Sequence, residues 1–315
     1  MTAPRGGALA GAGAARVAAQ GKLNLFLRVL AREAAGYHQL ETLFVRLELA
    51  DDVLVRARER GRTVDCVGPA LDAAALGPAE ANLAYRAAAT YSEEAGWPGG
   101  FEIEVRKRLP VGGGLGGGSA DAGAVLRALN ALNPTPLPQH RLFAVASAIG
   151  ADVPFLTAEA PLALAWGRGE RMLAFPALPP RAVALLLPPF GVATADAFAW
   201  LAEARAAAAG GAGDGRAAPQ PRVFFPHQFV DWVPVFRLAA NDFEPVVAAR
   251  YPEVGAAREA LVAQGARAAR MTGSGSTVFG LFDDAPDATA LERTSGCKAL
   301  ITRTAGRVVG VERAS

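Results

Sequence analysis

The fold of this chain is decided by one stretch, Pro110-Val111-Gly112-Gly113-Gly114-Leu115-Gly116-Gly117-Gly118-Ser119-Ala120-Asp121-Ala122. Six of the seven residues from 112 to 118 are glycines, which adopt positive φ angles and let a bulky anion approach main-chain N–H groups. Ser119 is a favourable N-cap, and apolar residues at helical spacing follow it. A helix that starts behind a bare glycine loop is suited to binding phosphate. We prefer this interpretation to a flexible linker, because Gly/Ser-rich linkers lack a preceding strand and a following amphipathic helix.

The residues around this loop exclude three common kinds of phosphate-binding site. The loop of nucleoside triphosphatases ends in Gly-Lys-Ser/Thr, whereas Gly118 is followed directly by Ser119. The dinucleotide pattern G-x-G-x-x-G fits three of the glycines, but it requires a second strand ending in an acidic residue about 20 residues later. Residues 130–136 indicate a helix exit instead, and the motifs of protein kinases are absent.

The remaining pattern, Pro-x-x-x-Gly-Leu-Gly-x-(Gly/Ser)-Ser-Ala, resembles the phosphate loop of the galactokinase, homoserine kinase, mevalonate kinase and phosphomevalonate kinase (GHMP kinase) superfamily. The resemblance runs from about Val17 to Val311. Within the superfamily, five further segments are similar to the 4-(cytidine 5′-diphospho)-2-C-methyl-D-erythritol kinases: Gly21–Leu27, Gly36–Phe44, Asn82–Ala88, Ile149–Phe155 and Met271–Ser276. These motifs are separated and occur in the family's order, so the resemblance is highly specific.

The resemblance implies an α+β, two-domain GHMP kinase fold, with an N-terminal domain like one found in ribosomal proteins, a ferredoxin-like C-terminal domain and a cleft between them. It implies ATP-dependent phosphorylation of the 2-hydroxyl of 4-(cytidine 5′-diphospho)-2-C-methyl-D-erythritol, in the non-mevalonate route to isopentenyl diphosphate. The alternatives are another small-molecule GHMP kinase, of the homoserine or mevalonate type, and a non-catalytic relative. The Tyr37-His38 element argues against the first, and the presence of Lys22 and Asp152 argues against the second.

The catalytic roles that the resemblance implies fall on Lys22 and Asp152. Phosphoryl transfer to an alcohol needs a group that accepts the hydroxyl proton, and a carboxylate such as Asp152 can do so. Lys22 would stand beside it and stabilise the oxygen as charge moves onto it. Residues Pro110 to Ala120 would wrap the phosphates of ATP. Mg²⁺ is expected with ATP, with its ligands unknown; Asp121 is one candidate, although acidic residues in a first helical turn are common for dipole reasons alone.

The substrate-binding residues are also carried over from the resemblance. Tyr37 and Phe198 would sandwich the cytosine ring, because an aromatic face on each side grips a flat base. His38 would hydrogen-bond the edge of the base. The other residues expected to contact the substrate are Asn24, Thr194, Gly273 and Ser274.

Hydrophobic periodicity predicts the order of elements along the chain. Lys22 and Asn24 alternate with leucines in a half-buried strand at 22–29, so the two polar side chains should share a face. The same analysis predicts the following further segments. Strands are expected at 40–49, 52–58, 62–67, 101–107, 162–166, 182–187, 268–272, 278–282, 298–303 and 308–311, and helices at 80–94, 119–132, 139–149, from 194, 244–250 and 253–264. The predicted divisions are a disordered tail (1–16), an ATP-binding domain (17–160) and a C-terminal domain (161–315) with a low-complexity loop near 203–222.

Composition excludes several other classes of protein. The 315 residues carry a formal net charge of +2, which does not indicate a nucleic-acid-binding surface. No run of apolar residues reaches 18, so the sequence predicts no membrane-spanning helix. Two separated cysteines imply neither a metal motif nor a disulfide framework and suit a reducing cytoplasm. We expect a cytoplasmic monomer or weak homodimer that binds no membrane. Basic residues at 106–108 should add positive potential beside the glycine loop.

Two features depart from the family pattern. Gln20-Gly21 replaces Pro-Ala before the lysine, and glycine there is expected to loosen the entry of the strand that carries Lys22. The segment 203–222 is longer than expected. Neither touches a residue with chemistry, so they bear on rate and not on the reaction.

Overall fold

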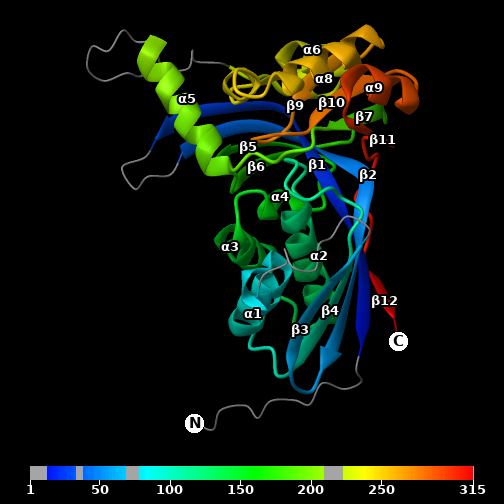
Figure 1. Cartoon of the computed structure of the whole chain (residues 1–315). Coiled ribbons are helices and arrows are strands. Elements are labelled where there is room, and N and C mark those ends of the chain that lie inside the picture. The colour runs from blue at the N-terminus through cyan, green and yellow to red at the C-terminus, as the bar shows by residue number, and fades with distance from the viewer. Residues whose placement is uncertain (1–12, 33–37, 69–77, 209–222, 315) are drawn as a thin grey trace.

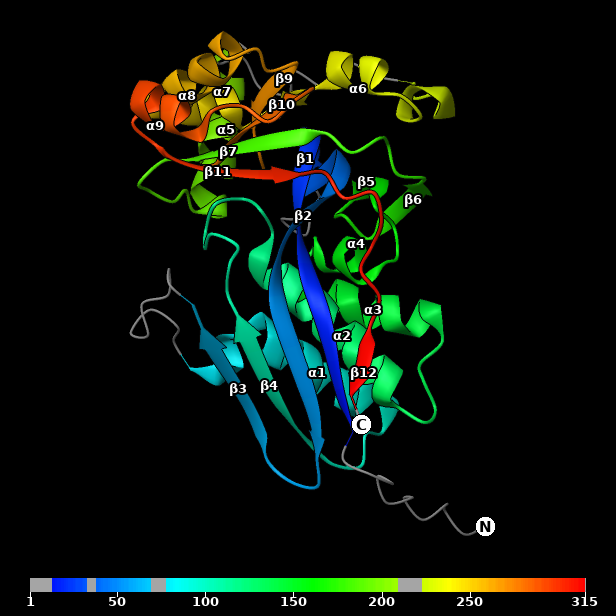
Figure 2. The same cartoon turned by 90° about the vertical axis from the view of Figure 1, so that its right-hand side faces the viewer.

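The computed structural model describes residues 13–32, 38–68, 78–208 and 223–314 (Figures 1 and 2). Its strands are β1 (Ala14–Arg32), β2 (His38–Arg58), β3 (Arg62–Val67), β4 (Gly100–Arg106), β5 (Leu162–Gly167), β6 (Arg171–Phe175), β7 (Ala182–Leu187), β8 (Ala240–Asn241), β9 (Ala268–Met271), β10 (Val278–Phe282), β11 (Lys298–Arg303) and β12 (Glu312–Ala314). Its helices are α1 (Leu83–Ala95), α2 (Gly117–Leu132), α3 (Gln139–Ile149), α4 (Val153–Thr157), α5 (Thr194–Ala208), α6 (Trp232–Leu238), α7 (Glu244–Ala248), α8 (Pro252–Ala263) and α9 (Ala288–Ser295), with 3-10 turns at Ala79–Ala81 and Pro226–Phe229.

Among the described residues, eight strands form a large sheet in the order β12-β1-β2-β4-β3, with β5 and β6 added beyond β2 and β8 beside β1. The long β1 and β2 pair antiparallel from Ala14↔Arg56 to Arg32↔His38. Burial alternates along the second half of β2, from 51 to 58, because helices cover one face of the sheet there. All six side chains of 42–47 are buried, because this part of the strand is covered on both faces.

The helices α1 to α4 cover one face of the large sheet (Figures 1 and 2). Helix α2 is the most central, and its side chains from 120 to 129 are all buried. Gly123 lets α4 lie directly against it: a Cβ atom there would stand 2.6 Å from the backbone carbon of Leu156. The close packing of α4 on α2 therefore depends on the absence of a side chain at Gly123.

A second, four-stranded antiparallel sheet has the order β11-β7-β10-β9. Alternate side chains of its central strands enter different cores. Val183 and Leu185 join the core of the large sheet. Ala184 and Leu186 join a second core with residues of α5, α7, α8 and α9. The small sheet is therefore a middle layer between the large sheet and these helices.

Several segment predictions need correction. The strands expected at 40–49 and 52–58 are one strand, and β6, α4, α6 and β8 were not anticipated. β1 begins at Ala14, so the predicted tail 1–16 ends in a strand, and α5 occupies 203–208 of the predicted loop. The last strand lies at Glu312–Ala314 and not at 308–311. Residues 1–12 of the predicted tail and residues 209–222 of the predicted loop lie outside the described residues.

The expected loosening at Gln20-Gly21 is not found. Strand β1 is continuous there, with a register shift between Gln20 and Lys22. Gln20 is buried, its amide nitrogen lies within hydrogen-bond distance of the carbonyls of Leu47 and Arg307, and its oxygen accepts the N–H of Val309. Gln20 therefore ties β1 to β2 and to the C-terminal segment. No helix among the described residues has the length and apolarity needed to cross a membrane.

We predict that Gly123→Ala destabilises the protein although alanine is the better helix former. The new methyl group would overlap the backbone at Leu156, and overpacking of this kind costs about 1–3 kcal/mol. Gly255 in α8 is the matched control, because a Cβ there meets nothing within 4 Å. Gly255→Ala should raise the free energy of unfolding by roughly 0.5–1 kcal/mol. Urea titrations measure both; a stabilising effect of Gly123→Ala would contradict the packing of α4 on α2.

Candidate active site

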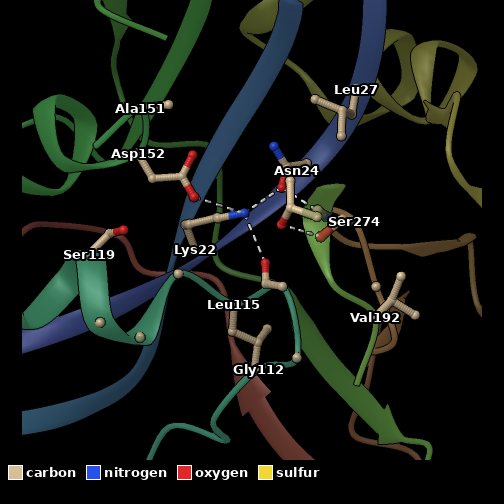
Figure 3. A pocket seen from close by; sticks show the side chains of 18 of the residues that line it. Lys22, Asn24, Leu27, Gly112, Leu115, Ser119, Ala151, Asp152, Val192 and Ser274 are labelled. Atoms are coloured by element: carbon tan, nitrogen blue, oxygen red, sulfur yellow. Dashed lines mark hydrogen bonds and ion pairs between the residues drawn. The ribbon is translucent and has the colours of Figure 1, made fainter. Parts of the chain in front are cut away.

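A cavity of about 640 Å³ lies between β1, the glycine loop and the loops of the second half of the chain (Figure 3). Most of the predicted site residues line it: Lys22, Asn24, Pro110, Gly112, Gly113, Gly114, Leu115, Gly116, Gly117, Gly118, Ser119, Asp152, Thr194, Phe198, Gly273 and Ser274. Of the remaining three in the described part, Val111 is exposed beside a neighbouring hollow, Ala120 is buried in α2, and His38 touches Phe198. Tyr37 lies outside the described residues.

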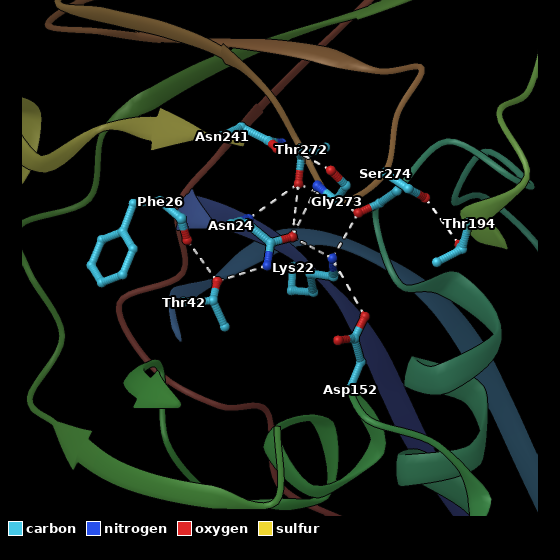
Figure 4. A network of polar contacts seen from close by, with 11 residues as sticks. Lys22, Asn24, Phe26, Thr42, Asp152, Thr194, Asn241, Thr272, Gly273 and Ser274 are labelled. Atoms are coloured by element: carbon cyan, nitrogen blue, oxygen red, sulfur yellow. Dashed lines mark hydrogen bonds and ion pairs between the residues drawn. The ribbon is translucent and has the colours of Figure 1, made fainter. Parts of the chain in front are cut away.

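The ammonium of Lys22 is the centre of the site (Figure 4). Its Nζ donates to Asn24 Oδ1 at 2.6 Å and to the carbonyl of Gly114 at 2.8 Å. It also lies 3.4 Å from Asp152 Oδ2. The side chain of Lys22 is 3% exposed and that of Asp152 is 31% exposed. The charge is therefore fixed in place, while the carboxylate beside it stays open to the cavity.

Asn24 shares a face with Lys22, as the alternation of β1 predicted, and it connects the two halves of the chain. Its Nδ2 donates to Thr42 Oγ1 at 2.8 Å, and its Oδ1 accepts the N–H of Gly273 at 3.0 Å. The backbone N–H of Asn24 donates to Thr272 Oγ1 at 3.1 Å. One amide therefore fixes Lys22 and the glycine turn after β9 together.

The glycine loop docks on β1 through its backbone. The N–H of Lys22 donates to the carbonyl of Leu115 at 3.0 Å. Gly114 has φ 77°, and a Cβ there would stand 2.2 Å from the carbonyl oxygen of Thr272, so only glycine fits. Gly116, with φ 71°, caps α2 and accepts the N–H of Ala120 at 2.7 Å. The prediction of Ser119 as the N-cap is thus wrong by three residues, because the left-handed Gly116 starts the helix earlier.

Asp152 lies where the sequence predicted, after the C-terminus of α3 and directly before α4. Gly150 ends α3, and the N–H of Val153 returns to the Gly150 carbonyl at 3.2 Å. The Asp152 side chain does not cap α4. Its carboxylate therefore faces the cavity and Lys22 (Figure 3).

The aromatic part of the site differs from its predicted arrangement. The ring of His38 stacks on Phe198, with centroids 4.0 Å apart and planes at 14°, and Phe243 meets Phe198 edge-on at 4.9 Å. His38 was expected at the edge of a base held between Tyr37 and Phe198. Instead its own ring covers a face of Phe198. The difference arises because β2 begins at His38 and brings the imidazole flat against α5.

Two further predicted substrate residues meet across the mouth of the cavity. Thr194 is the first residue of α5, and its Oγ1 lies 3.0 Å from Ser274 Oγ (Figure 4). Gly273 and Ser274 follow β9 in the turn that Asn24 holds. The side chain of Asn241 supports the same turn by donating to the carbonyls of Met271 and Gly273 at 2.7 and 2.8 Å.

The expected positive potential from 106–108 is largely cancelled at Lys107. This buried ammonium contacts Asp51 Oδ2 and lies 2.7 Å from Asp121 Oδ2. Asp51 Oδ1 also accepts the N–H groups of Arg108 and Leu109 at 2.5 and 2.7 Å. The cluster anchors the start of the glycine loop. Asp121 therefore points away from the cavity, and its candidacy as a magnesium ligand is not supported.

Burial raises the pKa of the Asp121 carboxyl to about 8, and the attraction of Lys107 only partly opposes this effect. Its Oδ1 is buried without a hydrogen-bond partner, which makes the charged form costly. Burial alone would lower the pKa of Lys107, but the attraction of Asp121 and Asp51 outweighs it and raises that pKa.

Sequence reasoning missed the residues that support the site. Asp51 and Asn241 carry no local motif, and only their partners in space reveal them. Thr42, which accepts a hydrogen bond from Asn24, could have been found, because it lies within the Gly36–Phe44 motif. Thr272 could have been found, because it lies within the Met271–Ser276 motif. Cys66 and Cys297 are free thiols, and no group of three or more His, Cys, Asp or Glu residues in the described ranges could hold a metal.

Two protein-family descriptions match the chain. Residues 82–159 match "GHMP kinases N terminal domain", and residues 231–295 match "GHMP kinases C terminal". The 4-diphosphocytidyl-2-C-methyl-D-erythritol kinase of Geobacter sp. (strain M21) is 36% identical over 291 residues, covering 91% of this chain and 97% of that protein. The corresponding kinase of Anaeromyxobacter sp. (strain K) is 42% identical over 271 residues, covering 84% and 79%.

Solved structures give the same result. A 4-(cytidine 5′-diphospho)-2C-methyl-D-erythritol kinase superposes with a TM-score of 0.71 at 34% identity, covering 94% of this chain and all of that one. A homoserine kinase from Cytophaga hutchinsonii has a TM-score of 0.65 at 17% identity, which shows the shared fold alone.

We predict that Asp121→Asn flattens the dependence of stability on pH. The carboxyl takes up its proton more readily in the folded than in the unfolded chain, where its pKa is about 4. Its contribution is therefore fully present below pH 4 and is lost as the pH rises toward 8. Asparagine keeps an oxygen for Lys107 but does not titrate. Urea titrations at pH 5 to 8 should show wild-type stability falling relative to Asp121→Asn; parallel profiles would contradict the assignment.

Proposed function

We propose that the cavity around Lys22 and Asp152 is where this chain phosphorylates the 2-hydroxyl of 4-diphosphocytidyl-2-C-methyl-D-erythritol. The chain belongs to the family of 4-diphosphocytidyl-2-C-methyl-D-erythritol kinases. It is an ATP-dependent GHMP kinase of the methylerythritol phosphate route to isoprenoid precursors. The observation that carries the assignment of the site is the 3.4 Å approach of Lys22 and Asp152 beside the glycine loop. Placed together, a carboxylate, a buried ammonium and a phosphate loop suit phosphoryl transfer to an alcohol.

The reaction moves one proton and one phosphoryl group. The acceptor O–H bond breaks and its proton passes to Asp152, which is open to the cavity. The acceptor oxygen forms a new bond to the γ-phosphorus of ATP. The bond between that phosphorus and the β,γ-bridging oxygen breaks, and its electron pair leaves with ADP. Lys22 is held by Asn24 and the Gly114 carbonyl, so its charge needs no reorganisation as the acceptor oxygen becomes negative.

The glycine loop supplies the ATP site in this proposal. Residues 112–119, with the N-terminus of α2 behind them, line the cavity and offer backbone N–H groups to the phosphates. Val111 and Ala120 stand at the two ends of the loop. Val111 is exposed beside a neighbouring cavity, and Ala120 is buried in α2, where it would support the loop from behind.

A magnesium ion fits the donors of the cavity. Mg²⁺ is usually held by one or two carboxylates together with substrate phosphates. Asp152 and Ser119 line the same cavity as the phosphate loop and could supply a carboxylate and a hydroxyl oxygen. When bound, the ion would neutralise charge on the phosphates.

The cytidine end of the substrate would lie at the opposite side of the cavity. Phe198 and His38 offer aromatic rings there, and Thr194 and Ser274 offer hydroxyl groups. In the proposed complex the base stacks against this aromatic group, with Tyr37 adjacent in sequence, while Asn24 and Gly273 border the part of the substrate nearest Lys22. We also propose that the protein is a monomer or weak homodimer that acts in the cytoplasm.

We predict that Asp152→Asn lowers kcat by roughly 10²–10⁴-fold, because the proton acceptor is lost. ATP binding, measured by calorimetry, should persist because the glycine loop is intact. Asp284→Asn, which changes an exposed carboxylate outside the cavity, is the matched control and should leave turnover unchanged. Retention of more than about a tenth of the activity in Asp152→Asn would falsify the assignment.

We also predict that Phe198→Ala weakens binding of the cytidine substrate and leaves the KM for ATP nearly unchanged. A stacked base contributes ~1–3 kcal/mol, so the substrate KM should rise at least about fivefold. The comparison substrate is 2-C-methyl-D-erythritol 4-phosphate, which lacks the nucleotide. It should be a poor acceptor for wild type, with a lower kcat as well as a higher KM, and Phe198→Ala should not impair it further. An equal loss on both substrates would place the base elsewhere.

A further inference from the structure

Two arginine side chains are buried between the large sheet and its helices: Arg46 of β2 and Arg127, which lies in the second half of α2. Arg46 is 1% exposed and donates to three carbonyls: Ala160 at 3.0 Å, and Phe155 and Ala158 at 2.7 Å each. Arg127 is 7% exposed, and the only hydrogen bond it makes to the described residues is from Nη2 to the carbonyl of Val309, at 2.6 Å. The two cations are close enough to repel one another.

Neither arginine has a carboxylate within 4.0 Å in the part of the chain that the structure describes. Burial, followed by the repulsion of Arg127, lowers the pKa of Arg46 to about 9. Burial also lowers the pKa of Arg127, and Glu159 only partly opposes it. Buried charges in proteins are ordinarily paired at close range, and among the described residues neither of these two cations has such a partner.

Arg127 lies in the wall of a second cavity, of about 460 Å³, between α2, α3, the end of α4 and the segment that leads to β12. Figure 2 shows this segment running down beside α2 and α3. A guanidinium carries five N–H donors. In Arg127 only Nη2 donates to a described residue, the carbonyl of Val309. No nitrogen of Arg127 is both fully buried and unpartnered, so its remaining donors are accessible from the cavity.

The start of α3 adds partial positive charge to the wall of the cavity. Gln139, in the first turn of α3, lies in its wall, and the unpaired N–H groups of a helix start carry partial positive charge. Arg313 donates to the carbonyl of Ala131, another residue of the wall. The single carboxylate facing the cavity from the described residues is the exposed Glu159. Among the described lining residues the full charges are thus Arg127, which is buried, and Glu159, which is exposed to solvent.

The remaining wall is apolar and comes from Leu137, Leu142, Phe143 and Val311. A volume of this size is in the usual range for a small-molecule site. The combination of a partly satisfied guanidinium and an apolar wall selects a ligand with one anionic end and one hydrocarbon end.

We propose that this cavity is a second ligand site, for a small organic anion whose phosphate or carboxylate group pairs with Arg127 and whose hydrocarbon part packs on Leu142, Phe143 and Val311. The site is separate from the proposed catalytic cavity: Arg127 follows Ser119 by two turns of α2, ~12 Å along the axis. A ligand here does not compete with ATP. Binding at this site is independent of the kinase assignment and is measured without turnover.

The test is calorimetric titration of n-butyl phosphate into the full chain saturated with ADP, which occupies the glycine loop. Pentanoate tests a carboxylate head, inorganic phosphate tests the head alone, and butan-1-ol tests the hydrocarbon alone. Arg127→Gln removes the charge but keeps an amide that can donate to Val309. Arg141→Gln is the matched control, because it removes an exposed arginine of α3 that pairs with Glu94 outside the cavity.

Butyl phosphate should bind the wild type and Arg141→Gln with equal affinity. It should bind Arg127→Gln at least about tenfold more weakly, because a charge-assisted hydrogen bond is lost. Inorganic phosphate should bind more weakly than butyl phosphate, and butanol should not bind. Glu159→Gln, at an exposed position that does not threaten folding, should bind butyl phosphate more tightly. Absence of binding to wild type up to about 10 mM, or equal binding by wild type, Arg127→Gln and Glu159→Gln, would overturn the proposal.

Discussion

The outer edge of β1 is the feature on which the rest of the structure depends. An edge strand presents unpaired N–H and C=O groups that must find partners. In this protein the partners are the functional segments themselves. The N–H of Lys22 takes the Leu115 carbonyl of the glycine loop, and the N–H of Asn24 takes the hydroxyl of Thr272. Further along, β8 pairs in parallel with Phe26 and Leu27. The hydrogen-bonding requirement of one strand thus assembles both sides of the cavity.

The same strand sets the electrostatics of the site. Its side chains alternate, so Lys22 and Asn24 point together into the space that the docked loops enclose. Each oxygen around the ammonium belongs to a different segment: β1, the glycine loop and the turn before α4. Lys107 repeats this arrangement one layer deeper, where Asp51 and Asp121 surround it and hold the start of the glycine loop. Lys22 lies beside an accessible carboxylate, whereas both carboxylates around Lys107 are buried, which separates a reactive charge from a structural one.

What the sequence could predict here depended on how local the signal was. Period-two alternation placed Lys22 and Asn24 on one face, and the Gly-Ala-Asp-Val-Pro turn placed Asp152 after α3, because each is determined by its own few residues. The start of α2 was misplaced, since a left-handed Gly116 closes the first helical hydrogen bond before Ser119. The stacking of His38 on Phe198 joins residues 160 positions apart, and no local pattern determines such a contact.

The pairing of β12 with β1 joins Ala14 to Ala314 and so brings together nearly the whole length of the chain. During synthesis on the ribosome, the first strand emerges long before the last one exists. The parts of its outer edge that pair with β8 and β12 stay open until those strands have left the exit tunnel, and contacts of such long sequence separation form slowly. Completion of this sheet therefore waits for the last strand of the fold. Until then the emerging chain carries an unpaired stretch of strand edge, which is an aggregation hazard that the finished fold removes by pairing it.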